Sequence, residues 1–419
     1  MVDDLGYLDN DRILKRLPNI RKLFLEGGMR FTRMYNEAPL CCPARANFQG
    51  GQHTLRNGVT TNTFEGFDTS RTLATALADV GYHTIIAGKY LNNYDGSVVP
   101  PGWHRALINR YHSVPSSVFW VDGRLTTFEG RFFDDVTRQK AVRWLGQAPR
   151  DRPVFELLTP YAPHRHRQKC GSNTALTCTL LPAVIKPDRR SPRCAALPPF
   201  KPPSYRLDSD GPQYPTKWPA GWPLETTCES LLIVDRMVGQ LVKAQAERKR
   251  PAIFVFMSDN GMSWGQHGLP LKTVPWSTRL PFYVAGSGVR RGATGKLLSI
   301  IDVPVTLADY ARAHMPWADG TSFRRLLQGR SFSGRSELLE IMPKPPGAAA
   351  YLGWEAIRTR RWRYLRWETG AVQLFDLVRD PWELRDLGQE RAAKATQMDE
   401  RLDRLLAVAE RPARARRSR

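Results

Sequence analysis

Short apolar segments alternate with stretches of helical periodicity along about the first three hundred residues of the chain. This order predicts an α/β domain in which helices flank a large, mostly parallel sheet. The segments expected to form strands are His83–Ala87, Val154–Leu158, Ala252–Met257 and Pro281–Ala285. Those expected to form helices are Thr72–Val80, Phe132–Leu145, Glu229–Glu247 and Val303–Arg312.

The pattern changes beyond Arg330 to short strands followed by a charged helix. The expected elements are strands at Ala356–Thr359, Arg363–Trp367 and Gln373–Asp376 and a helix at Glu390–Glu410. We therefore expect a catalytic α/β domain at 1–330, a small C-terminal α+β subdomain with an antiparallel sheet at 331–410, and a basic tail at 411–419. Arginine and aromatic residues interleave over Arg358–Trp367, and the part of this segment that alternates with period two indicates an amphipathic strand with one charged face.

Periodicity disappears between Arg165 and Trp222, a stretch dense in proline, arginine and cysteine. It is too long for an ordinary connection, so we expect a loop near the substrate or an irregular excursion. Three cysteines lie in this stretch, namely Cys170, Cys178 and Cys194. In an exported protein they could form a disulfide, although their spacing leaves the pairing open.

Composition and charge limit the classes of protein to which this chain can belong. The hydrophobic content of 42% is that of a folded globular chain, and no apolar run is long enough to cross a membrane. The net charge of +22 favours acidic partners, but no nucleic-acid-binding motif accompanies it. The start at Met1–Asp4 is not a signal peptide, so the chain as written is expected to stay in the cytoplasm.

Five polar motifs are candidates for chemistry, and three of them follow predicted strands directly or closely. They are Asp3-Asp4, Cys41-Cys42-Pro43-Ala44-Arg45, Gly88-Lys89, Pro163-His164, and Ser258-Asp259-Asn260-Gly261 with Lys272 downstream. Taken singly, most of these motifs are commoner as turns or helix caps, and a cysteine is commoner as a small core residue. Their order favours one site, because the carboxyl ends of parallel strands meet at one edge of a sheet.

The residue types suit hydrolysis of a sulfate or phosphate ester, in which oxygens gain negative charge that fixed cations and a metal ion can stabilise. Oxygen donors suited to calcium or magnesium are Asp3, Asp4, Asp259 and Asn260. Cations for the tetrahedral anion are Arg45, Lys89 and Lys272. His164 is a candidate for moving a proton, and Cys41 for the nucleophile.

The string Cys41–Arg45 resembles the Cys-x-Pro-Ser-Arg signature of the sulfatases in the alkaline phosphatase superfamily, and the resemblance covers nearly the whole chain. Asp3-Asp4 and Ser258–Gly261 resemble the metal-binding motifs of that family. The segments Gly88–Tyr94 and Pro100–Trp103 are similar to the branch that contains N-acetylglucosamine-6-sulfatases and arylsulfatase-like proteins.

The resemblance implies that a formylglycine-generating enzyme oxidises Cys41 to formylglycine, whose hydrated form attacks the sulfur of a sulfate monoester. One divalent ion, calcium or magnesium, would be bound by Asp3, Asp4, Asp259, Asn260 and the modified side chain at position 41. Arg45 would support the nucleophile. The substrate sulfate, on an aryl or carbohydrate molecule, would be bound by Lys89, His164 and Lys272.

The sequence departs from the family pattern at three places. Ala44 replaces the usual serine, and Gln49-Gly50-Gly51-Gln52 stands where the family has Leu-Thr-Gly-Arg. No strand precedes Asp3, so we expect a central strand to be missing and the start to be truncated. Two alternatives stay open: a phosphonate monoester or phosphodiester hydrolase on the same fold, and an inactive polyanion-binding homologue.

Overall fold

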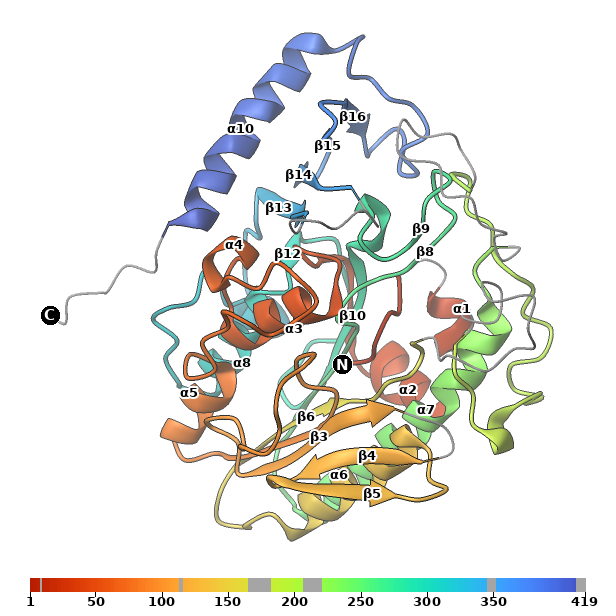
Figure 1. Ribbon diagram of the computed structural model, residues 1–419, viewed down its shortest axis with the longest axis vertical. Coiled ribbons are helices and arrows are strands. Elements are labelled where there is room, and N and C mark those ends of the chain that lie inside the picture. The colour runs from red at the N-terminus through yellow and green to blue at the C-terminus, as the bar shows by residue number, and fades with distance from the viewer. Residues whose placement is uncertain (8–9, 113–115, 165–181, 206–220, 345–351, 412–419) are drawn as a thin grey trace, which may run out of the picture.

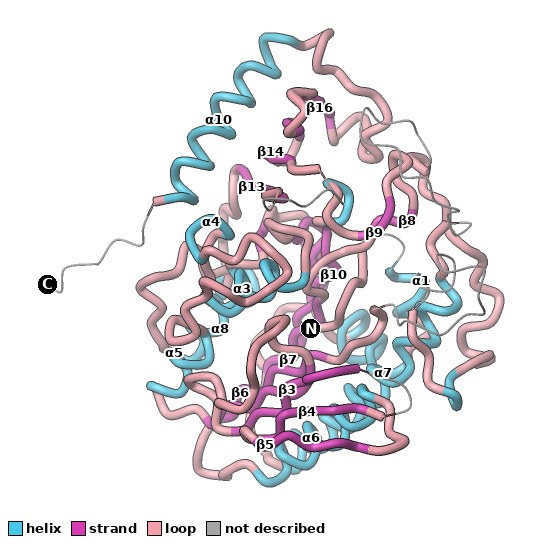
Figure 2. The backbone as a smooth tube through the Cα atoms, in the orientation of Figure 1, coloured by secondary structure: helices cyan, strands magenta, loops and turns pink. Residues whose placement is uncertain are grey.

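The computed structural model describes all residues except 8–9, 113–115, 165–181, 206–220, 345–351 and 412–419. One five-stranded sheet, with β10, lies in the middle of the molecule, a second, with β3 to β5, lies below it in the view, and a four-stranded sheet lies at the opposite end near the long helix α10 (Figures 1 and 2). Helices cover both faces of the central sheets, so the structure confirms the α/β class.

The first central sheet has the order β11-β1-β10-β7, with β12 beside β1. Its strands are β1 (Met29–Tyr35), β7 (Ile253–Met257), β10 (Arg279–Gly286), β11 (Gly292–Thr294) and β12 (Leu298–Ser299). Strand β10 runs antiparallel to both β1 and β7, whereas β11 and β12 run parallel to β1. A short antiparallel pair, β8 (Ser263–Trp264) and β9 (Pro270–Leu271), lies beyond β7 in the chain.

The second central sheet has the order β5-β4-β3-β2-β6. Its strands are β2 (His83–Gly88), β3 (Arg105–His112), β4 (Ser117–Val121), β5 (Arg124–Phe128) and β6 (Val154–Thr159). Strand β2 is parallel to β3 and β6, and the hairpin partners β4 and β5 are antiparallel. Both sheets are therefore mixed, and in the second one short connections such as the β4–β5 turn return the chain without a crossover helix.

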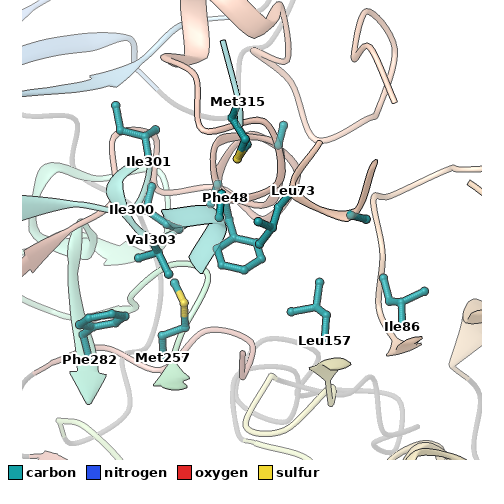
Figure 3. Packing of buried hydrophobic residues seen from close by; sticks show 14 of the residues in the cluster. Phe48, Leu73, Ile86, Leu157, Met257, Phe282, Ile300, Ile301, Val303 and Met315 are labelled. Atoms are coloured by element: carbon teal, nitrogen blue, oxygen red, sulfur yellow. The ribbon is translucent and has the colours of Figure 1, made fainter. Parts of the chain in front are cut away.

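Helices form a layer on each side of the sheets. One layer contains α3 (Cys41–Gly50), α4 (Thr54–Asn57), α5 (Leu73–Asp79), α8 (Asp302–Ala311) and α9 (Arg324–Leu327). The other contains α1 (Asn10–Leu14), α2 (Pro18–Ile20), η1 (Arg21–Glu26), α6 (Phe133–Gln147) and α7 (Leu224–Glu247). Single turns are η2 (Lys186–Asp188) and η3 (Pro275–Ser277). Figure 3 shows Phe48 and Leu73 facing each other within the core cluster that joins the first layer to β7 and β10.

Met1 and Val2 bridge the two central sheets, and the N-terminus lies near the centre of the molecule (Figure 1). The Met1 amino group donates to Leu158 O at 2.8 Å on β6, and the Val2 N–H donates to Met257 O at 2.8 Å on β7. Burial lowers the pKa of that amino group to about 5. Along the rest of the gap, which none of the described strands fills, lies an apolar cavity of about 240 Å³. The bridge places Asp3 at the carboxyl ends of both strands.

The third sheet has the order β13-β14-β15-β16 and is antiparallel throughout. Its elements are β13 (Glu337–Met342), β14 (Trp354–Thr359), β15 (Trp362–Trp367) and β16 (Val372–Asp376), and α10 (Ala392–Glu410) packs against it. The expected antiparallel sheet and C-terminal helix are thus present. The boundary at residue 330 stays a prediction.

The strands expected at Ala356–Thr359 and Arg363–Trp367 are present, but the charged face expected within Arg358–Trp367 is wrong, because two of its arginines are buried. The segment is a hairpin of β14 and β15, in which Arg358 lies opposite Arg363. Both guanidinium groups are buried against Glu340 and Glu383, at 3.0 Å for Arg358–Glu340 and 2.7 Å for Arg363–Glu383. Alternation alone did not reveal this burial because the partner carboxylates come from distant parts of the chain.

The structure pairs Cys194 with Cys228 of α7 in a disulfide, with the two Cα atoms 5.6 Å apart. The sequence left the pairing of Cys194 open, and its partner lies outside the irregular segment, because the long helix brings Cys228 beside it. Cys170 and Cys178 lie outside the described residues. Among the described helices, none combines the length and the apolarity that a membrane crossing requires.

Candidate active site

The sequence motifs converge at the ends of β2, β6 and β7. Lys89 follows β2, His164 lies just beyond β6, and Asp259 and Asn260 follow β7. Gly88 ends β2 with a φ of +121°, and a Cβ there would lie 2.1 Å from Thr159 O, so only glycine allows the chain to turn Lys89 into the site.

Cys41 begins α3 and its thiol lies inside the cluster of charged groups. Cys41 Sγ is 3.6 Å from Asp3 Oδ1 and 2.8 Å from Lys272 Nζ. Burial, reinforced by the Asp3 carboxylate, raises the pKa of this thiol to about 11. An unmodified Cys41 would therefore be a protonated thiol at neutral pH and a weak nucleophile.

Each of the three carboxylates contacts a cation. Asp3 Oδ2 lies 2.6 Å from Lys89 Nζ, and Asp4 Oδ1 lies 2.9 Å from Lys272 Nζ. Asp259 Oδ2 accepts from Arg45 Nε at 2.8 Å. The contacts come from five separate segments of the chain, so the fold rather than local sequence creates this charge cluster.

Arg45 lies one helical turn after Cys41, and this spacing puts both side chains on the same face of α3. Besides contacting Asp259, its guanidinium donates to Lys89 O at 2.7 Å and lies 3.5 Å from Asp3. Arg45 is almost fully buried, at 2% exposure. It therefore ties α3 to the end of β2 and to two of the carboxylates.

Nearby positive charges keep the carboxyl groups of Asp3 and Asp4 ionised. Burial alone would raise the pKa of Asp3, but the nearby positive charges, Lys89 first among them, outweigh it and hold that pKa far below its usual range. Burial also opposes ionisation of Asp4, but Lys272 together with the other nearby positive charges outweighs it and lowers the pKa of Asp4. For Asp259, burial and the nearby Asp3 charge raise the pKa to about 6, which leaves it mostly ionised at neutral pH.

His164 lies 3.3 Å from Asp4 Oδ2 and 3.3 Å from Lys272 Nζ, and its ring packs on Tyr161 with centroids 4.4 Å apart. Burial lowers the pKa of His164 to about 4, although Asp4 acts in the opposite direction. The imidazole is therefore neutral near pH 7. In that form it can donate one hydrogen bond and accept another.

The donor set fits a hard divalent cation. Ligand atoms of Asp3, Asp4, Cys41 and His164 all lie within 4.8 Å of one another. The Asn260 amide donates to Asp4 Oδ1 at 2.6 Å, while its own Oδ1 is buried without a hydrogen-bond partner among the described residues. A buried amide oxygen among ionised carboxylates is what calcium or magnesium coordinates in proteins. All of these residues had been assigned to the site from the sequence. His164 had been expected to bind the substrate sulfate rather than the metal.

Two residues that support the site were missed in the sequence. Asn36 donates from Nδ2 to Asp259 O at 2.9 Å. Asp134, in the first turn of α6, accepts from the Tyr161 N–H at 2.6 Å and from the Ala162 N–H at 3.1 Å, just ahead of His164. An aspartate in the first turn of a helix is common for helix stability alone, so no sequence signal points to this contact.

A family model described as Sulfatase matches residues 1–319, more than half of the chain. The chain therefore belongs to the sulfatase family, a family of enzymes that hydrolyse sulfate esters. It is 26% identical to the choline-sulfatase of Rhizobium meliloti (strain 1021) over 93% of this chain and 81% of that protein. It is also 26% identical to the N-acetylglucosamine-6-sulfatase of Capra hircus, over 79% of this chain and 64% of the relative, which is less than two thirds of its length.

Solved structures share the fold. One of them, a protein in complex with its substrate D-glucosamine-2-N,6-O-disulfate, superposes with a TM-score of 0.77 at 18% identity. The superposition covers 99% of this chain and 98% of that one. At this identity the likeness establishes the fold, and the reacting residues are argued from their geometry.

Proposed function

We propose that the protein hydrolyses sulfate monoesters with Cys41 in its formylglycine form and one divalent metal ion, calcium or magnesium. The observation that carries this proposal is the position of Cys41 Sγ, between Asp3 and Lys272 in a buried cluster of three carboxylates and three cations. When bound, the metal would act as a Lewis acid towards sulfate oxygens, and formylglycine would supply a nucleophile that the protonated thiol lacks.

The metal would be held by Asp3, Asp4, Asp259 and Asn260. Their supports are already in place: the Asp4 and Asn260 N–H groups donate to Asp259 Oδ1 at 3.2 and 2.7 Å. Ligands fixed in this way need little rearrangement to bind an ion. The Asp4 backbone has a φ of +66°, a costly conformation for a residue with a side chain, which fits a position that ligand geometry dictates.

The remaining residues would bind the sulfate group and assist the leaving oxygen. Lys89 and Lys272 offer fixed positive charges for the non-bridging oxygens, at positions where burial strengthens each interaction. Neutral His164 has one N–H group that can donate a hydrogen bond to the leaving oxygen. Arg45 keeps its charge at all relevant pH values. Through its contact with Asp259 it fixes the position of α3, and so of Cys41, relative to that carboxylate.

The names of similar proteins suggest both small and carbohydrate substrates. One relative is a choline-sulfatase, another an N-acetylglucosamine-6-sulfatase, and the structural neighbour binds a disulfated glucosamine. We therefore propose an aryl or carbohydrate sulfate as the substrate class.

Turnover of nitrophenyl sulfate by protein coexpressed with a formylglycine-generating enzyme tests this function. We expect Cys41→Ala to abolish release of nitrophenol, because the reacting side chain is lost. Cys42→Ala is the matched control: its side chain belongs to the apolar core cluster, and we expect turnover to persist. Faster hydrolysis of a nitrophenyl phosphodiester than of the sulfate would instead favour the phosphodiesterase alternative. Retained heparin binding without any hydrolysis would favour the inactive homologue.

A further inference from the structure

A second cavity, of about 340 Å³, lies between the start of β10, the β14–β15 turn and the residues that follow Asp4. Five arginines line it, namely Arg33, Arg279, Arg358, Arg360 and Arg363. Among its described lining residues the one acid is Glu383. The cavity is distinct from the Cys41 cluster, whose reacting side chains do not line it.

Two of the five arginines are already neutralised. Arg363 lies 2.9 Å from Glu340 and 2.7 Å from Glu383, and Arg358 lies 3.0 Å from Glu340. Two buried guanidinium groups and two buried carboxylates therefore form a cluster with no net charge at one wall of the cavity. This quartet fixes the shape of the cavity but adds no net charge to it.

The other three arginines leave the cavity strongly positive. Arg33 and Arg360 pair with no carboxylate of a described residue. Arg279 stacks over the Tyr7 ring at 3.9 Å and donates from Nε to Thr32 O at 3.1 Å, so no carboxylate neutralises it either. Three guanidinium groups around one cavity are suited to an oxyanion, because the planar fork matches sulfate and carboxylate oxygens.

The lining also offers apolar surface for the body of a ligand. Trp276 and Trp382 belong to the wall together with Tyr7. Trp276 is held in place by stacking on His267 at 3.8 Å and by donating from Nε1 to Glu383 at 3.0 Å. A cavity with aromatic walls and a few convergent charges is the usual form of a small-molecule site.

The cavity lies close to the reacting groups along three segments of the chain. Gly6 comes two residues after Asp4, and Met262 comes two residues after Asn260. Residues two apart have Cα atoms at most about 7 Å apart. Trp276 likewise follows Lys272 by a few residues. One molecule with two anionic groups could thus reach both sites.

We propose that this cavity binds a second anionic group, a sulfate or a carboxylate, of the molecule whose sulfate ester is hydrolysed at Cys41. The inference rests on the proposed function and narrows it: the substrate is a polyanionic glycan rather than a small monosulfated molecule. Part of the excess positive charge of the chain then serves substrate recognition.

The kinetic test compares a multiply sulfated heparin disaccharide with nitrophenyl sulfate in Arg33→Gln and Arg360→Gln variants. A charged hydrogen bond lost on binding changes affinity by about tenfold or more, so KM for the disaccharide should rise by that factor. The kcat/KM for the disaccharide, divided by the kcat/KM for the aryl sulfate, should fall by the same factor. The matched control is Arg124→Gln, which removes one exposed positive charge on β5 and should leave the ratio unchanged.

Binding of the disaccharide to the inert Cys41→Ala protein, measured by calorimetry, separates this inference from the proposed function. Weaker binding in the Arg33→Gln and Arg360→Gln backgrounds supports the cavity even without turnover. Equal loss in the Arg124→Gln background would overturn it, as would unchanged binding in all variants. Binding of a DNA oligonucleotide as tight as that of the disaccharide, with the same sensitivity, would also overturn it by revealing a general polyanion surface.

Discussion

At the scale of single residues, the site depends on burial as much as on residue type. The Cys41 thiol would be a free cysteine of ordinary reactivity on the surface, but burial raises its pKa to about 11. Lys89 and Lys272 would normally lose affinity for their protons when buried, yet the carboxylates Asp3 and Asp4 reverse that effect and raise the pKa of each lysine. Both lysines therefore stay charged at the pH of any ordinary assay.

Removing one of these charges should affect the reaction far more than the fold. Lys272→Ala takes away a cation that contacts both Asp4 and Cys41. We expect kcat/KM for nitrophenyl sulfate to fall by about a hundredfold or more, the usual cost of losing a group that stabilises developing negative charge. The measurement is steady-state kinetics, with circular dichroism as a check on folding. A loss of less than threefold would place Lys272 outside the reacting centre.

Much of the candidate site was predictable from the sequence because its motifs are short strings, three of which follow strands. Cys41 with Arg45 and Asp259 with Asn260 are recognisable as strings. Asp134 and Asn36 were not, since each acts through a contact with a distant backbone group. A single sequence contains no information on such contacts until the strands are placed in space.

At the scale of elements, α6 and the chain after β6 act together. The Asp134 carboxylate accepts two backbone N–H groups at 161 and 162, and the Asp3 N–H donates to Ala162 O at 3.2 Å. One helix turn therefore positions both His164 and the start of the metal-ligand segment.

The variant Asp134→Ala should lower kcat by about tenfold, as expected for a group that positions reacting residues without touching the substrate. The neighbouring Asp135→Ala is the control, because Asp135 pairs with Arg131 and Arg138 on the solvent side of the same helix. Kinetics on nitrophenyl sulfate would measure both, and Asp134→Asn, which keeps one acceptor oxygen, should recover part of the rate. Equal effects of the two alanine variants would contradict the positioning role.

The elements themselves were predicted well where apolar runs were long. Strands β2, β6, β7 and β10 and helices α5, α6 and α8 lie within a few residues of their predicted bounds. The sequence did not predict β1, the strands β3, β4 and β5, or β13, and it did not predict the direction of β10. Direction depends on which neighbour a strand meets in space, and apolar periodicity is the same for both directions.

At the scale of the whole molecule, charge balance governs ligand binding. Three carboxylates, Asp3, Asp4 and Asp259, face three cations, Arg45, Lys89 and Lys272, so the buried cluster is close to neutral. A divalent cation alone would add two buried positive charges, and sulfate alone two negative ones. Each should therefore favour the binding of the other.

Thermal unfolding in calcium, in sulfate and in both tests this coupling. We expect the shift of Tm with both ions to exceed the sum of the separate shifts, because ligands that bind only the folded state stabilise it by mass action. At a hundredfold excess over Kd one ligand contributes about 2.7 kcal/mol. Chelation with EDTA should reverse the calcium effect. Asp259→Asn should abolish that effect, whereas the surface control Asp151→Asn should keep it. A calcium shift that survives in Asp259→Asn would contradict the ligand assignment.

The mass of the tryptic peptide Met34–Arg45, taken from protein that hydrolyses nitrophenyl sulfate, tests the central role of Cys41 most directly. We predict that active protein carries an aldehyde at position 41 in place of the thiol, with Cys42 unchanged, and that activity scales with the modified fraction. Active protein in which every Cys41 remains a thiol would contradict the account.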